Sequence, residues 1–157
     1  MRHENKRQQY LYEWAMALIS GEYTQGRSTL ARLAGGQLMF CCLGVLAITH
    51  MATLQVIGSE CKFLTYDEDG DLTRDKNHLP HSIATKLRIN TNPEMTLCEH
   101  DKLLVIKCMK EFDRASGKEQ GREEYYRNSV EAQQSLATLN DNGVPFPIIA
   151  QFILRYV

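Results

Sequence analysis

The segment from residue 42 to residue 54 constrains the fold of this chain more than any other. It contains no Lys, Arg, Asp or Glu, and its apolar residues fall on nearly every side of a helix. A helix without a polar face has to be surrounded by other elements. The most apolar stretch, Leu38–Ile48, is too short to cross a bilayer. We therefore expect a buried central helix at 42–54, in which Gly44 lets another backbone approach closely.

The length and charge of the chain favour a single neutral domain around this helix. The 157 residues, 43% of them hydrophobic, are enough for one core. The 18 basic and 19 acidic residues leave a net charge of -1, which gives no overall attraction to nucleic acid or to anionic lipid. No apolar block like that of a secretory signal follows the polar start. We expect a cytoplasmic protein with no membrane partner, and nucleic acid is disfavoured as a partner.

The pattern along the rest of the chain predicts an α+β fold. It is mainly helical, a single compact domain at 1–157 of about five or six helices with one or two small β-hairpins. Residues 1–7 are a candidate for disorder, and 115–121 are expected to be a flexible connection. The predicted helices are at 8–20, 42–54, 79–89, 97–112, 123–139 and from Pro145 onward, and the predicted hairpins have turns at Gly35–Gly36 and 67–71.

The adjacent pair Cys41–Cys42 suggests one catalytic hypothesis. The chain has five cysteines, an odd number, with no CxxC motif, so neither a disulfide framework nor a zinc site is indicated. A thiol at a helix N-terminus can have a lowered pKa and act as a nucleophile, with His50 or one of the other histidines as base. The favoured alternative is that both cysteines are small core residues.

A polar loop at 23–29 is the more promising binding element. It offers a phenol, an amide, a guanidinium and hydroxyl groups within a short stretch, which suits a phosphate or a planar polar ligand. It lacks the lysine and the spacing of a P-loop. The alternative is that these groups satisfy buried backbone and hold the loop against the core. The candidate ligand-binding or partner-binding residues are Tyr23, Gln25, Arg27, Ser28, Asn140 and Asp141.

Two other clusters are weak candidates for metal binding. The turn Asp67–Asp71 carries alternate carboxylates but lacks the spacing of an EF-hand, and an exposed acidic turn is the better interpretation. His78 and His81 have no clear third ligand. We expect neither a metal nor a cofactor.

Several blocks of sequence have a recurring order and spacing. They are Trp14, the run LISGEYTQG at 18–26, CCLGVL at 41–46, Leu79–Pro80, LNDNG at 139–143, Phe146 and Ile149–Ala150. Together they resemble a family of small, uncharacterised phage and prophage proteins with the pattern W..AL.SG.Y.QG…CCLGVL…LP…LNDxGxxFxxIA. The resemblance implies a viral or prophage origin and supplies no catalytic residue. The segment Thr91–Gln134 lies outside the pattern.

These observations favour a non-enzymatic accessory protein of a phage or prophage. We expect it to act in the host cytoplasm by binding a host factor, for example as an inhibitor of a bacterial defence system. Two alternatives stay open, a nucleotide-binding sponge that uses the 23–29 loop and a small cysteine-dependent enzyme. The expected partner is a host protein or a small nucleotide signal, and a homo-oligomer is a further alternative.

Overall fold

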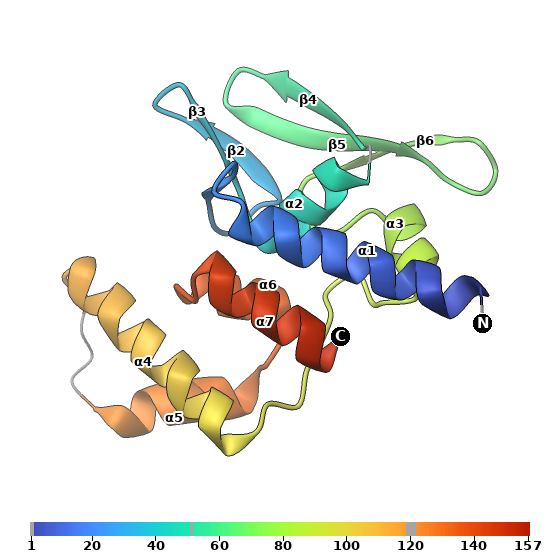
Figure 1. The fold of residues 1–157 in the computed structure, drawn as a ribbon. Helices are drawn as coiled ribbons and strands as arrows, with labels where there is room; N and C mark the ends of the chain where they lie inside the picture. Colours follow the sequence, from blue (N-terminus) through green and yellow to red (C-terminus); the bar gives the residue numbers. More distant parts are fainter. Residues whose placement is uncertain (1, 51, 119–121) are drawn as a thin grey trace.

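The apolar segment forms helix α2 (Cys42–Thr49), which lies between a β-sheet and helix α1 (Arg2–Ile19) (Figure 1). The computed structural model describes residues 2–50, 52–118 and 122–157. Residues 42–47 of α2 are all buried, as the lack of a polar face predicts. The predicted helix is too long, because α2 ends at Thr49 and Thr53 already belongs to a strand.

The strands join into one sheet, which corrects the prediction of one or two small β-hairpins. The described strands are β1 (Thr24–Gln25), β2 (Ala31–Ala34), β3 (Gln37–Phe40), β4 (Thr53–Ile57), β5 (Glu60–Tyr66) and β6 (Leu72–Asp75). Their order is β1-β3-β2-β5-β4, with β6 also paired to β5, and only β1–β3 is parallel. Both predicted hairpins are present as β2–β3 and β5–β6.

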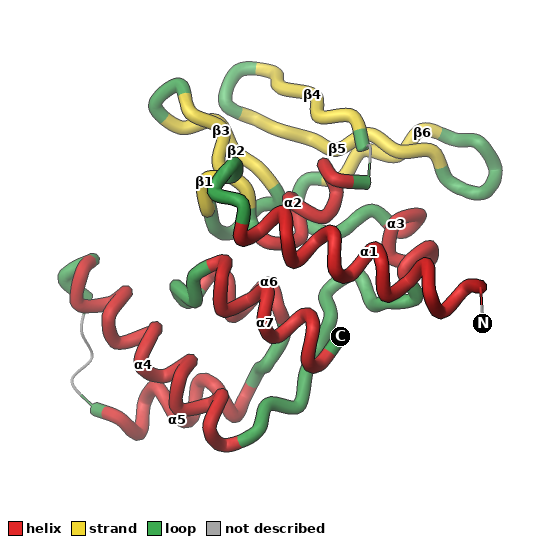
Figure 2. The backbone as a smooth tube through the Cα atoms, viewed as in Figure 1, coloured by secondary structure: helices red, strands yellow, loops and turns green. Residues whose placement is uncertain are grey.

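The sheet is larger than predicted for two reasons. A third hairpin, β4–β5, turns at Gly58, whose φ of +64° suits glycine. A bridge between Arg32 and Glu60 then joins β2 to β5, so that all three hairpins share one sheet. In Figure 2 the strands form a layer on one side of α1 and α2.

The other described helices are α3 (His81–Leu87), α4 (Glu99–Ala115), α5 (Glu123–Ala132), α6 (Leu136–Asp141) and α7 (Phe146–Tyr156). The single helix predicted at 123–139 is wrong, because the chain is extended at Gln133 and restarts as α6. The carbonyl of Gln134 accepts the amide of Met95 at 3.0 Å, and its side-chain Oε1 accepts the amide of Leu97 at 2.8 Å. These hydrogen bonds to the α3–α4 connection stabilise the extended chain between α5 and α6.

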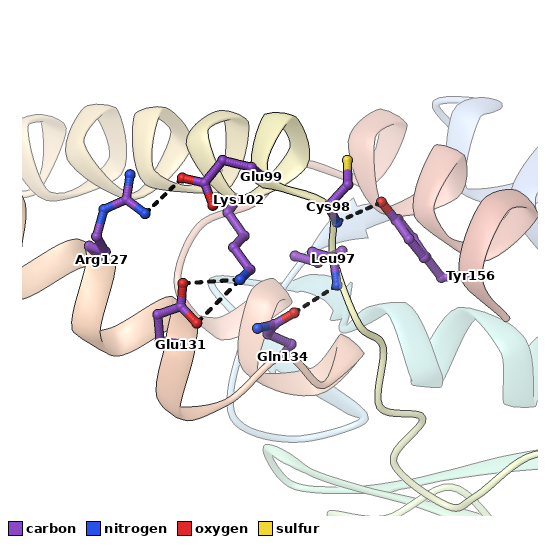
Figure 3. Close-up of polar contacts among 8 residues, drawn as sticks. All are labelled: Leu97, Cys98, Glu99, Lys102, Arg127, Glu131, Gln134 and Tyr156. Atoms are coloured by element: carbon purple, nitrogen blue, oxygen red, sulfur yellow. Dashed lines mark hydrogen bonds and ion pairs between the residues drawn. The ribbon is translucent and has the colours of Figure 1, made fainter.

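The described parts of the segment 91–134 contribute to the core. Figure 3 shows α4 and α5 joined by Arg127–Glu99 at 2.8 Å and Lys102–Glu131 at 3.0 Å. These exposed ion pairs contribute little, and packing holds the helices together. The buried hydrophobic side chains that the two helices contribute are Val105, Ile106, Cys108, Met109, Tyr126 and Val130.

The two segments considered for flexibility have different outcomes. From Arg2 onward the candidate for disorder at 1–7 is the first part of α1, and the Arg7 side chain donates to the carbonyls of Leu87 and Val157. Of the connection expected at 115–121, Ala115 ends α4, Ser116 caps it, and 119–121 lie outside the described residues. None of the described helices has the length and apolar character needed to cross a membrane.

The contact between α2 and the chain at Leu30 yields a first prediction. A Cβ at Gly44 would overlap the carbonyl oxygen of Leu30, which already accepts the amide of Cys41 at 3.0 Å. We expect Gly44→Ala to lower the free energy of unfolding by about 3 kcal/mol, because backbone has to move. Urea denaturation, monitored by circular dichroism, measures this change in the free energy of unfolding.

Gly21→Ala is the matched control for this variant. Gly21 has a φ of +79° but nothing within 4 Å of its Cβ position. Its substitution should cost only about 1 kcal/mol of backbone strain. Equal losses for the two variants would contradict a steric role for Gly44.

Candidate functional site

Four of the six predicted binding residues, Gln25, Ser28, Asn140 and Asp141, meet where the segment before β2 touches α6. We call Gln25, Gly26, Cys42, Asn140 and Asp141 the Asn140 clasp. The fully buried Asn140 side chain donates from Nδ2 to the carbonyl of Gly26 at 2.8 Å. Its Oδ1 accepts Gln25 Nε2 at 3.0 Å and the amide of Cys42 at 3.1 Å. One amide therefore joins the loop, the start of α2 and α6.

Further hydrogen bonds fix the loop on both sides of this centre. Gln25 Nε2 also donates to the carbonyl of Val144 at 2.8 Å. Asp141 Oδ1 accepts the amide of Ser28 at 2.9 Å, and Ser28 has a φ of +73°, which is uncommon for a residue other than glycine. Tyr23 packs edge-on against Phe40, with ring centroids 5.5 Å apart. Each of these contacts orders the loop.

Arg27 differs from the rest of the loop. Its guanidinium lies over the Phe112 ring of α4, 4.1 Å from the centroid, a cation–π contact. Its Nε is buried with no hydrogen-bond partner. Burial lowers the pKa of Arg27, Asp141 opposes that shift, and Arg32 adds to it. Arginine nevertheless stays charged at any physiological pH.

The clasp is built for holding segments together. The buried amide and the Asp141 carboxylate are engaged with backbone and with Gln25, so a ligand would have to displace internal hydrogen bonds. Asn140 and Asp141, considered also as groups that orient a base, have no histidine among their hydrogen-bond partners in the described residues. The geometry supports the alternative in which the loop is a structural element.

The cysteine pair lies in the core beside the clasp. Cys41 is the N-cap residue of α2 and its Sγ accepts the amide of Gly44 at 3.4 Å, while Cys42 is fully buried. Burial raises the pKa of Cys41 to about 11 and that of Cys42 well above its usual value. These shifts are opposite to the activation that a nucleophile needs.

His50 is too far from the thiols to act as their base. It caps the other end of α2, about 12 Å away for a helix of eight residues. There it packs edge-on against Tyr10 at 4.7 Å, and burial lowers its pKa. No base–thiol pair is assembled among the described residues that we considered for catalysis.

The metal candidates are not assembled into a site either. Asp67 Oδ1 accepts the amides of Asp69 and Asp71, at 3.0 and 2.8 Å, which stabilises the turn. Among the described residues, no group of three His, Cys, Asp or Glu side chains is placed to hold a metal ion. The turn and His81 line a cavity of about 280 Å³ that is open to solvent.

Sequence reasoning missed a basic pocket between α1 and α3. Its lining residues are Lys6, Arg7, Tyr10, Lys86 and Arg88, around a cavity of about 250 Å³. The excess of basic over acidic residues in the first 40 positions indicated the half of the pocket that α1 contributes. The other half comes from a segment about 80 positions away, and no local pattern joins the two.

A family model for a domain of unknown function, DUF8296, matches residues 6–157, and the chain belongs to that family. The matched range includes the segment 91–134, which the quoted sequence blocks do not cover. No curated protein and no solved structure matches the chain. The comparisons thus support an uncharacterised family over nearly the whole length.

The clasp predicts a large loss of stability for Asn140→Ala. The variant leaves the Cys42 amide and the Gly26 carbonyl buried without partners. We expect it to lower the free energy of unfolding by about 3 kcal/mol. The neighbouring Asn142 has no side-chain hydrogen bond among the described residues, so Asn142→Ala should cost below about 0.5 kcal/mol. Similar urea midpoints for the two variants would refute the clasp.

The burial of Cys41 and Cys42 predicts slow alkylation in the folded protein. Iodoacetamide at pH 7.5 should label the exposed Cys98 first, and the buried pair only after unfolding, because thiols with raised pKa hold little thiolate. Mass spectrometry of tryptic peptides measures the order. Labelling of Cys41 at a rate comparable to Cys98 would show that the thiol is accessible and reactive.

Proposed function

We propose that this chain is a binding protein without a catalytic step, an accessory protein of a phage or prophage that acts on a host factor. The proposal rests on the residues at and beside the clasp that could take part in catalysis, because their side chains are buried or already hydrogen-bonded within the protein. The thiols are buried with raised pKa, and the amide and carboxylate are occupied by internal hydrogen bonds. An active site needs groups that are free to meet a substrate.

A surface that suits a protein partner lies along α1. Tyr12, Met16 and Ile19 are 56%, 38% and 47% exposed. Their spacing of four and three residues puts them on one face of the helix. The opposite face buries Leu11 and Trp14, whose indole donates to the Cys42 carbonyl at 2.9 Å. We call these three exposed residues the α1 stripe, and aromatic and Met side chains are typical of the centres of protein interfaces.

The nature of the partner rests on the resemblance to phage and prophage proteins. Such a protein meets host components in the cell it is made in, and a component of a defence system is the class of host factor we would examine first. The overall charge of -1 is compatible with a protein partner and gives no general attraction to nucleic acid.

The test is a capture experiment with matched variants. A tagged chain, Met16→Asp and Tyr66→Asp are each used to capture proteins from host lysate. Tyr66 is 69% exposed on the sheet, so its variant adds the same charge to a different surface. We expect Met16→Asp to reduce recovery of one host protein by about tenfold, because a charge at the centre of an interface is desolvated. Tyr66→Asp should retain it.

Two outcomes would contradict the proposal. Recovery of every host protein unchanged by Met16→Asp, with circular dichroism showing that all three proteins are folded, would remove the α1 stripe from the proposal. Turnover of a host metabolite by the purified chain, abolished in Cys41→Ala or Cys42→Ala, would favour the enzyme alternative.

A further inference from the structure

The basic pocket between α1 and α3 has an unusual concentration of charge. Four of its five lining residues, Lys6, Arg7, Lys86 and Arg88, are cationic, and none is acidic. The fifth, Tyr10, contributes a ring. In Figure 1 the first turns of α1 run beside α3, so residues about 80 positions apart line one cavity.

Two of the cationic side chains are held in place. Arg7 donates from Nε to the carbonyl of Leu87 at 2.9 Å and from Nη2 to the carbonyl of Val157 at 2.7 Å. The Lys86 ammonium lies 5.1 Å from the centroid of the Tyr10 ring, a cation–π contact. Side chains that are already ordered lose less conformational entropy when a ligand binds.

Arg88 occupies a backbone position that favours glycine. It is the C-cap residue of α3, with φ 54° and ψ 47°, in the left-handed region. Glycine is the usual residue at such a helix end, and a side chain there costs conformational energy. A strained residue is a reason to look for a function of its side chain.

The pocket also lacks counter-ions. No described carboxylate forms an ion pair with Lys6, Lys86 or Arg88. Other cationic side chains do form such pairs, namely Lys76, Lys102, Arg127 and Arg155. The positive potential in this region is therefore only weakly compensated.

We propose that the pocket between α1 and α3 binds a small ligand that carries phosphate groups. Four cations around one cavity match a ligand with several negative charges, and a guanidinium can bind phosphate through two parallel hydrogen bonds. The cavity of about 250 Å³ is concave and has the size for a compact polyphosphate moiety. This site is separate from the 23–29 loop and from the α1 stripe, and it does not depend on the proposed function.

Inorganic pyrophosphate is the probe for the test. Isothermal titration calorimetry at low ionic strength compares the wild-type chain with Lys86→Ala, Arg88→Gly and Lys107→Ala. Lys107 is an exposed lysine of α4, so its variant removes one charge outside the pocket. We expect Lys86→Ala and Arg88→Gly to weaken binding by about tenfold each, and Lys107→Ala by less than about twofold.

Arg88→Gly also separates binding from folding. Because glycine relieves the left-handed strain, its melting temperature should equal or exceed that of the wild type while its affinity falls. Loss of affinity together with a lower melting temperature would mean that Arg88 has a structural role, and the proposal would fail.

Three further results would overturn the assignment. The first is no pyrophosphate binding at concentrations up to about 1 mM. The second is an equal loss for Lys107→Ala and Lys86→Ala, which would show general surface electrostatics. The third is tighter binding of a single-stranded oligonucleotide than of pyrophosphate, which would replace a small ligand by a polymer.

Discussion

The buried amide of Asn140 is the interaction on which the rest of the structure depends. It satisfies a carbonyl of the loop before β2, the first amide of α2 and the side chain of Gln25. Asn140 lies 98 to 115 positions along the chain from these groups. An apolar side chain at this position would fill the space but leave the backbone groups without partners, which is costly in a dry interior. The position thus requires both a donor and an acceptor.

The clasp explains why residues with reactive side chains need not form a reactive site. Cys41 caps α2 through its sulfur, while the Cys42 amide donates to Asn140 and the Cys42 carbonyl accepts from the Trp14 indole. In this arrangement small size and buried backbone connections matter more than thiol chemistry. The same holds for Asp141, whose carboxylate orders the Ser28 turn. All three residues therefore have structural roles.

The elements that the sequence predicted correctly are those that depend on residues close together in the chain. The Gly35–Gly36 turn between short apolar runs predicted the β2–β3 hairpin and the acidic turn at 67–71 predicted β5–β6, and Pro145 correctly marked the start of α7. Strand β4 was missed because the apolar run continues from α2 into it without a change of composition. The break before α6 was missed because hydrogen bonds to Met95 and Leu97, about 40 positions away, create it.

In the candidate site, too, local patterns could be predicted from the sequence and long-range contacts could not. The sequence singled out Gln25, Asn140 and Asp141 of the clasp as candidate binding residues, but it did not reveal their roles, which depend on Asn140 reaching Gly26. The basic pocket joins residues 6–10 to 86–88, and only the fold brings them together.

The packing of α1 against α7 has a consequence for how the protein folds. Arg7 of α1 donates to the carbonyl of Val157, so the first helix is held by a segment about 150 positions later in the chain. Until α7 is in place, α1 lacks the helix against which it packs in the folded protein. Long-range closure of this kind slows folding and leaves apolar surface exposed in the meantime.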